Sequence, residues 1–469
     1  MERTLDWKQG LFISLGVPML VLPSIGYFTN YMWAFSIVIW AISVLQGFFQ
    51  NLAYGELASK YPEASGLPGF VQQVFSGKDK KANRFSKFLG GFSAWGYWFA
   101  WAPVVAVYSI LIADYLQGLI PSLEGFSSTL LGFLIGIIVS IIMFLANWKG
   151  VSGGAKLSNI LGVISLAPLL IIAIVPFFTG DFAWSNITNY MIPPDWTWDS
   201  THFLIFFGLL SMAEWSACGW ETAAVYAPEY KKPKSDIPKA LFSCGFICLV
   251  CYVLVQTACV GTLGVEGVIS QPLSPMLGVA EVSLGRIGAY IAIPMLIAAM
   301  LLIIQTGFLG TAKALESLSK EGNLPPIFQK TNKHGVPVGA MVADTIFTIF
   351  LISLGNPATI IAAGALGYVV ANGMSLFAYV KSKKDDSLEN LKNEEVFWAP
   401  KGWKFVALIW GLLNIPVYFI GTIYITVSEY GWQTAMIGVV ILALYIPLWF
   451  YSKKSFITEE VTVTLSDKK

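Results

Sequence analysis

Two glutamates are the only charged residues in an otherwise apolar stretch, and they are the side chains best placed to do chemistry. The stretch runs from residue 201 to residue 228, and Glu214 and Glu221 lie on either side of Gly219. A carboxylate is costly to bury in a membrane, so both are candidates for proton coupling or gating. Glu221 has the alternative role of a structural acid that binds free backbone N–H groups. Glu214 could pair with a cationic amine, or be a hydrated side chain near the helix end.

Backbone breaks form a second signal, in the first and sixth apolar segments. Gly16 and Pro18 interrupt the first segment, because glycine holds a helical turn poorly and proline lacks an N–H. Gly219 and its small neighbours weaken the sixth. Backbone groups freed in hydrocarbon cost several kcal/mol each, so such breaks persist where they line a cavity or a ligand. The candidate binding residues at the two breaks are Ser14, Gly16, Val17 and Pro18 in the first segment and Trp215, Ser216, Ala217, Cys218 and Gly219 in the sixth.

The composition indicates which elements must position these residues. The chain has 469 residues, of which 56% are hydrophobic and 12% charged, too few charges to cover a soluble surface of this size. Apolar windows of about 20 residues recur along it and predict an all-α membrane protein of twelve transmembrane helices. Broken segments at the corresponding positions one and six predict two inverted repeats of five helices, with a site midway through the bilayer.

The placement of lysine and arginine predicts the topology. With twelve spans, every basic residue except Arg286 falls on one side, which places both termini in the cytoplasm and the chain in the plasma membrane. The expected organisation is a first repeat over residues 1–180, a second over 181–380, two further helices over 381–452 and a cytoplasmic tail over 453–469. The net charge of +1 does not point to nucleic acid, so the expected partners are a small molecule and the bilayer, with no nucleic acid.

Metal and cofactor chemistry is not indicated. The five cysteines lie in apolar stretches and are better explained as packing residues than as a disulfide or zinc framework. His202 and His334 lie near opposite membrane faces, and the sequence has no phosphate-binding loop of an ATP-driven pump. We therefore expect no metal, no cofactor and no catalytic residue.

Three separated motifs carry a family resemblance. They are AYGELASKYPEASG over Ala53–Gly66, the run from Trp215 to Glu221 with its continuation over Ala227–Pro238, and the loop region from Thr311 to Pro337. They resemble the amino acid–polyamine–organocation (APC) superfamily, most closely its basic amino acid/polyamine antiporter branch. The resemblance covers roughly residues 8–450. It implies the LeuT-like fold and secondary transport of amino acids or amines.

The resemblance also implies roles for single residues. It places Ala100, Trp101, Gln305 and Thr306 at the site, and Trp215 as an aromatic that closes over the substrate. Packing is the alternative for Trp215, and bonding to a carbonyl of its own helix is the alternative for Thr306.

The chain departs from the family pattern at two positions. Gly16-Val-Pro-Met-Leu20 replaces the usual Gly-Ser-Gly-Ile-Phe run, so Pro18 has no N–H to offer a substrate carboxylate. Ser165 stands where many proton-coupled members carry a lysine. Coupling through an acid, exchange, or a sodium site all remain open.

The predicted function is secondary transport by alternating access, as an exchanger or a proton-coupled symporter. The alternatives are a nutrient sensor on a transporter fold and a sodium-coupled carrier of another small organic solute. An ion channel or an intramembrane enzyme fits less well, because broken helices predict saturable flux and the sequence offers no catalytic constellation. Glu214 favours a cationic amine, whereas Val17 and Ala217 favour a neutral, apolar amino acid. The sequence does not predict the oligomeric state.

Overall fold

The described part of the chain is helical throughout. The computed structural model describes residues 5–14, 16–62, 64, 66–76, 83–148, 166–217, 221, 230–384 and 396–453. Within these ranges the one β-type pairing is an isolated parallel bridge between Leu5 and Tyr230. The prediction of an all-helical protein is therefore confirmed.

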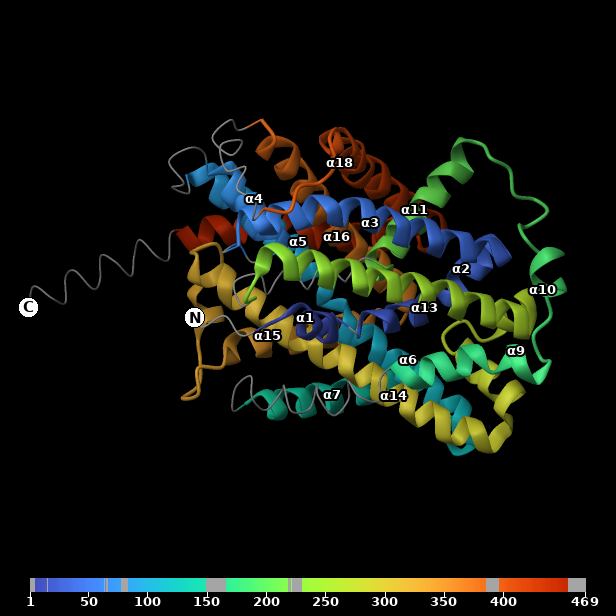
Figure 1. Cartoon of the computed structure of the whole chain (residues 1–469). Coiled ribbons are helices and arrows are strands. Elements are labelled where there is room, and N and C mark those ends of the chain that lie inside the picture. Colours follow the sequence, from blue (N-terminus) through green and yellow to red (C-terminus); the bar gives the residue numbers. More distant parts are fainter. Residues whose placement is uncertain are drawn as a thin grey trace, which may run out of the picture.

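The helices run along one bundle (Figure 1). The α-helices are α1 (Trp7–Ser14), α2 (Ile25–Met32), α3 (Ser36–Lys60), α4 (Gly66–Phe75), α5 (Arg84–Trp101), α6 (Pro103–Leu119), α7 (Ser128–Asn147), α9 (Pro176–Thr179), α10 (Ser185–Thr188), α11 (Ser200–Ala217), α13 (Pro233–Ser270), α14 (Pro275–Lys320), α15 (Val338–Ser353), α16 (Pro357–Ser382), α18 (Trp403–Leu412), α19 (Phe419–Tyr430) and α20 (Trp432–Ala443). Short 3-10 helices are η1 (Val17–Ser24), η2 (Trp33–Phe35), η3 (Pro121–Leu123) and η6 (Pro326–Gln329), and η7 (Leu413–Tyr418) is a π-helix.

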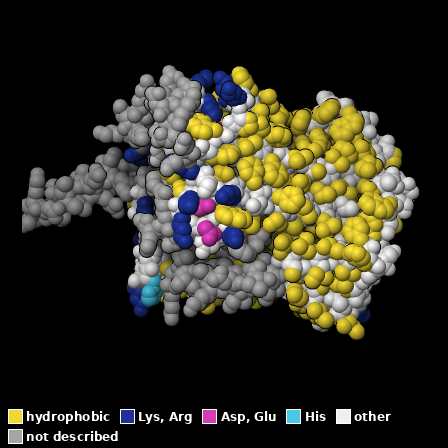
Figure 2. Space-filling view, viewed as in Figure 1, with side chains coloured by type: hydrophobic (Ala, Val, Ile, Leu, Met, Phe, Trp, Pro, Cys, Tyr) yellow, Lys and Arg dark blue, Asp and Glu magenta, His cyan; other side chains and the backbone are white. Residues whose placement is uncertain are grey.

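Long apolar stretches identify the protein as a multi-pass membrane protein. Within the described residues, eight are long and apolar enough to span a bilayer: Val17–Lys60, Arg84–Leu119, Ser128–Asn147, Pro233–Ser270, Pro275–Lys320, Pro357–Ser382, Trp403–Tyr430 and Trp432–Lys453. Large apolar side chains on α7, such as Ile138 and Leu145, are exposed as a lipid-facing surface requires. Figure 2 shows apolar side chains over most of the visible face, with lysine and arginine gathered toward one end.

The first apolar segment is interrupted where the sequence predicts it. The α-helix α1 ends at Ser14, Gly16 forms a turn, and the chain continues from Val17 as the 3-10 helix η1. Pro18 lies in the first turn of η1, where its missing N–H is tolerated. In the sixth segment, α11 ends at Ala217. Cys218 and Gly219 lie outside the described residues, as does the side chain of Ala217.

The apolar stretch that contains Asn356 and Pro357 is divided at these residues. Helix α15 ends at Ser353 and α16 begins at Pro357. The Asn356 side chain accepts a hydrogen bond from the backbone N–H of Ala358 at 2.8 Å, which caps α16.

Close packing joins the elements that surround the breaks. Helix α3 packs on α13, and α5 packs on α16. At the second contact Gly96 and Gly367 meet backbone to backbone, since a Cβ placed on Gly367 would lie 2.5 Å from the carbonyl oxygen of Gly96. The α5–α16 pair therefore forms a tight wall beside η1 and α11.

Candidate functional site

A small cavity lies between η1, α5, α6, α11 and α16. It is lined by Leu20, Ala100, Trp101, Val104, Trp215 and Tyr368 and has a volume of about 10 Å³. A space of that size holds about one water molecule, so an amino acid fits only after side chains move. Three residues predicted at the site, Ala100, Trp101 and Trp215, thus come together here.

Trp215 closes one side of this cavity. Its indole is buried, with 4% of the residue exposed, and Nε1 donates a hydrogen bond of 2.6 Å to the carbonyl oxygen of Ala100. The bond ties α11 to the end of α5. Trp215 therefore packs tightly and also lines the cavity, whereas its predicted role of closing over a substrate stays a prediction.

Tyrosine hydroxyls contact backbone carbonyl groups of the first and sixth apolar segments. The Tyr252 hydroxyl on α13 lies 2.8 Å from the carbonyl oxygen of Val17 and 2.6 Å from that of Ser216. A hydroxyl has one proton, so it donates to one of these carbonyls at a time and contacts both. Tyr108 on α6 donates to the carbonyl oxygen of Met19 at 2.7 Å. The first and sixth segments therefore meet at a single side chain.

The other predicted residues of the two breaks that the structure describes, Ser14, Gly16, Val17, Pro18 and Ser216, are buried. Val17 and Pro18 lie in η1, and the Ser14 hydroxyl donates to the carbonyl oxygen of Gly10 at 3.3 Å. The Ser216 hydroxyl lies 3.4 Å from the carbonyl oxygen of Met212, within its own helix. Gly16 packs near α14, where an added Cβ would meet the Ile303 side chain at 3.4 Å. These positions surround the contact, but their side chains do not line the small cavity.

Gln305 and Thr306 are directed elsewhere. The Gln305 amide forms a reciprocal pair with the Asn147 amide, with both hydrogen bonds 3.0 Å long, and so joins α14 to α7. The Thr306 hydroxyl donates to the carbonyl oxygen of Leu302 in its own helix at 3.0 Å. Neither side chain lines the cavity in this conformation. Thr306 instead binds a carbonyl of its own helix, which was the alternative to a place at the site.

Glu214 sits in a buried amide network rather than at a hydrated helix end. Its Oε1 accepts hydrogen bonds from Gln50 of α3 at 2.5 Å and from Asn372 of α16 at 2.8 Å. Asn372 also donates to Asn414 in the π-helix η7 at 3.1 Å. Glu214 is fully buried, and its Oε2 has no hydrogen-bond partner among the described atoms. The alternative of a hydrated side chain is therefore wrong, and the network joins α3 and α11 to α16 and η7.

Glu221 is the second buried carboxylate near the cavity. Its Oε1 accepts a hydrogen bond from the Tyr97 hydroxyl at 3.3 Å, and Tyr368 also bonds to its side chain. Because Tyr368 lines the cavity, Glu221 is one side chain removed from it. In the described part of the chain, neither Glu221 nor Glu214 forms an ion pair.

A charged cluster lies at the basic end of the bundle, at the end of α3. The buried Glu56 carboxylate pairs with Lys60 and with Lys383, the latter at 2.6 Å. It also accepts hydrogen bonds from the Tyr379 hydroxyl at 2.9 Å and the Ala399 N–H at 3.0 Å. Ion pairs and hydrogen bonds therefore account for the burial of Glu56. The cluster joins α3 to the end of α16 and to the chain before α18.

Several residues around the cavity and Glu214 were not predicted from the sequence. They are Tyr252 and Tyr368, which serve the breaks and the cavity, and the amides of Gln50, Asn372 and Asn414 around Glu214. The available signal was the presence of amides inside apolar helices, which need polar partners when buried. In the described residues, no group of three His, Cys, Asp or Glu side chains could hold a metal ion.

Comparison with known proteins agrees with this arrangement of apolar helices around a buried polar centre. An uncharacterized transporter of Legionella pneumophila is 26% identical over 90% of this chain and 91% of its own length. An arginine/ornithine antiporter of Lactococcus lactis is 25% identical over 88% of this chain and 76% of its own length. A lysine-specific permease of the same organism is 25% identical over 80% of this chain and 74% of its own length. The amino acid permease family model matches residues 5–446. The chain therefore belongs to the amino acid permease family and is a membrane transporter of amino acids rather than an enzyme.

Proposed function

We propose that this permease carries a zwitterionic amino acid with an uncharged side chain across the plasma membrane by alternating access. The proposed fold is LeuT-like, with twelve transmembrane helices, inverted repeats over residues 1–180 and 181–380, two further helices over 381–452 and a cytoplasmic tail over 453–469. Both termini are cytoplasmic in this proposal. Its support is the change from α-helix to 3-10 helix at Gly16 and the gathering of basic side chains at one end.

The contact at Tyr252 carries the proposal. It brings the carbonyl groups of Val17 and Ser216 to one hydroxyl, next to the cavity beneath Trp215. A substrate amine would replace that hydroxyl as the donor to these carbonyls. The substrate carboxylate would bind the N–H groups of Gly16 and Val17, where the N-terminal end of η1 favours negative charge. Ala217, Cys218 and Gly219 complete the proposed site from the sixth segment, with Ser14, Pro18 and Ser216 beside them.

The lining of the cavity supports an uncharged substrate side chain. Leu20, Trp101, Val104 and Trp215 are apolar, and Glu214 is not among the lining residues. The second candidate is a cationic amino acid. The names of the arginine/ornithine antiporter and the lysine-specific permease favour it, and so does Glu221, which lies behind Tyr368.

Glu214 and Glu221 are the proposed coupling or gating groups. A carboxylate only accepts hydrogen bonds, whereas a carboxylic acid also donates one. Protonation of Glu214 would therefore rearrange its bonds to Gln50 and Asn372, which join α3 and α11 to α16. In this mechanism α1, α3, α11 and α13 rock against α5, α7, α14 and α15. Gln305 and Thr306 belong to the second group and would approach the site only as it opens.

Uptake into proteoliposomes tests the proposal. Purified protein is reconstituted and presented with a panel of radiolabelled neutral, acidic and basic amino acids and polyamines, with and without an imposed pH gradient and with and without sodium. We expect saturable uptake of a neutral amino acid. Uptake of arginine, ornithine or lysine alone would favour the cationic candidate. Binding without uptake of any panel member would indicate a sensor and refute transport by this chain, and dependence on sodium would refute proton coupling.

A further inference from the structure

A large lysine-lined cavity at the basic end of the bundle is distinct from the proposed substrate site. It has a volume of about 980 Å³ and lies against the start of α13. Among the described residues, its lining includes four lysines, Lys231, Lys232, Lys234 and Lys239, and no aspartate or glutamate. A cavity of this size accommodates a small organic ligand.

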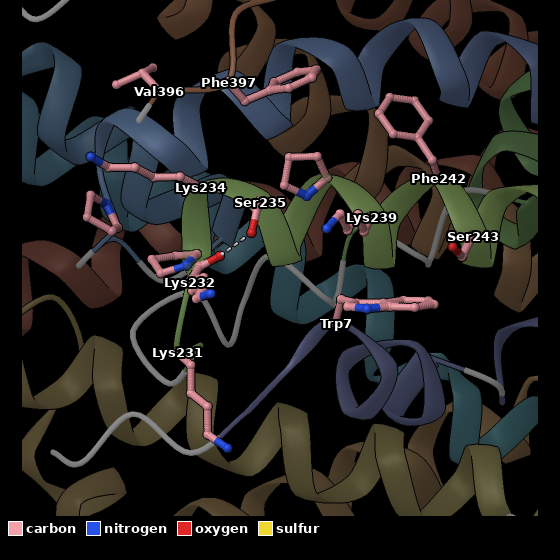
Figure 3. A pocket seen from close by; sticks show the side chains of 13 residues that line it. Trp7, Lys231, Lys232, Lys234, Ser235, Lys239, Phe242, Ser243, Val396 and Phe397 are labelled. Carbon is pink, nitrogen blue, oxygen red and sulfur yellow. Dashed lines mark hydrogen bonds between the residues drawn. The ribbon is translucent and has the colours of Figure 1, made fainter. Parts of the chain in front are cut away.

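The cavity combines positive charge with aromatic surface. Figure 3 shows Trp7 on one side of the first turns of α13 and Phe242 and Phe397 on the other, with the Lys239 amine over the helix itself. Lys231 and Lys234 extend outward from this centre. Tryptophan beside lysine is typical of the level of lipid headgroups, and basic pockets between membrane helices suit phosphate-bearing headgroups.

Asp236, in the first turn of α13, forms no ion pair with Lys232 or Lys239 in the described part of the chain. Asp236 is 7% exposed, and its carboxylate accepts hydrogen bonds from the backbone N–H of Lys232 at 3.1 Å and from the Ser235 hydroxyl at 3.4 Å. It therefore serves the first turn of α13 instead of the cavity. Lys232 and Lys239 are both exposed, so their amines are accessible to a ligand.

We infer that this cavity binds the phosphate-bearing headgroup of an anionic phospholipid through Lys232 and Lys239, with Trp7, Phe242 and Phe397 against its apolar part. Trp7 is the first residue of α1, which leads to the break at Gly16. A bound headgroup therefore holds α1 against α13 and favours the closed arrangement of that segment. This effect on α1 rests on the proposed alternating-access mechanism, whereas binding of the lipid does not.

Melting of the full-length protein in nanodiscs tests lipid binding. Nanodiscs are made from phosphatidylcholine with increasing fractions of phosphatidylglycerol, and the wild-type protein should melt at higher temperature as the anionic fraction rises. The double variant Lys232→Gln/Lys239→Gln should need about 25-fold more phosphatidylglycerol for the same shift, about fivefold for each lysine. The Lys232→Arg/Lys239→Arg variant should keep the shift. The charge-matched control Lys330→Gln/Lys333→Gln removes two exposed lysines outside the cavity and should also keep it.

Three results would overturn the inference. The first is an unchanged response of the Lys232→Gln/Lys239→Gln variant to phosphatidylglycerol. The second is an equal shift produced by inorganic phosphate in pure phosphatidylcholine, which would make the ligand a free anion. The third is a loss of stability in pure phosphatidylcholine that added phosphatidylglycerol does not change, which would indicate that the lysines bind the chain itself, for example the acidic stretch over residues 385–395. The nanodisc experiment measures the melting temperature and not transport. A lack of uptake in the proteoliposome assay would therefore not affect the conclusion about lipid binding.

Discussion

Replacing Tyr252 by phenylalanine removes a hydroxyl that contacts both the first and the sixth apolar segment. The residue is fully buried, and its ring packs against Trp40 with the centroids 5.1 Å apart, so the ring itself should remain in place. The change leaves the carbonyl oxygens of Val17 and Ser216 without this donor. The substitution therefore tests the contact between the segments without opening a large cavity.

The expected size of the effect follows from the single proton that the Tyr252 hydroxyl can donate. One hydroxyl donates one hydrogen bond at a time, so the closed arrangement loses one buried bond, and leaving a buried acceptor unpaired costs about 1–3 kcal/mol. When the segments separate, the carbonyl groups meet water or substrate and the penalty disappears. The closed arrangement is thus disfavoured by about 5–150-fold relative to the open one.

Net uptake of radiolabelled amino acid into proteoliposomes that contain none measures this effect, because the carrier must then return empty through the closed arrangement. We expect Tyr252→Phe to lower the rate of net uptake by about 5–150-fold. The matched control is Tyr445→Phe, a buried tyrosine whose hydroxyl makes a long 3.4 Å bond to the carbonyl oxygen of Phe88. A folded Tyr252→Phe variant whose net uptake lies within about twofold of this control would refute the reasoning, since an energy of 1 kcal/mol already exceeds that factor.

Further substitutions test the surrounding contacts. Glu214→Gln keeps the shape of the side chain and one acceptor oxygen, so the free energy of unfolding should change by less than about 1 kcal/mol. Uptake by this variant should no longer respond to an imposed pH gradient. A response equal to that of the wild type would exclude Glu214 as the coupling group. Glu56→Gln leaves the amines of Lys60 and Lys383 without their carboxylate. It should therefore lower the free energy of unfolding by about 3–5 kcal/mol, measured by denaturant titration. A loss below about 1 kcal/mol would contradict a buried ion-pair cluster. Gly367→Ala places a Cβ 2.5 Å from a backbone oxygen of α5 and should lower the free energy of unfolding by about 1–3 kcal/mol. The control Gly310→Ala, whose added Cβ meets nothing within 4 Å, should leave stability unchanged or raise it. Equal melting temperatures of the two variants would contradict the packing of α5 on α16.

The helical membrane fold was predictable because few sequence features determine it. Apolar windows about 20 residues long and the placement of basic residues follow directly from the thickness and electrostatics of the bilayer. The interruption at Gly16 was predictable for a similar reason, since glycine and proline act on the backbone locally. The division between α15 and α16 at Pro357 follows from the same rule.

The site was predictable only in part. The family resemblance pointed to Trp215, which lies near the end of α11 and lines the small cavity of the proposed site. The direction of a polar side chain inside a helix depends on the rotation of that helix and on its neighbour, so Gln305 could not be distinguished from a site residue until its pairing with Asn147 was seen. Tyr252 gave no signal, because its role depends on carbonyl groups that only the folded chain brings together.

Structure determination by cryo-electron microscopy, in nanodiscs and with the transported amino acid bound, tests the central claim most directly. We expect the first helix to be interrupted at Gly16 and the sixth near Gly219, with density for the amino acid between them, in contact with Leu20, Trp215 and Tyr368. Two helices that run unbroken through the bilayer, with the amino acid bound elsewhere, would contradict this site and the transport mechanism built on it.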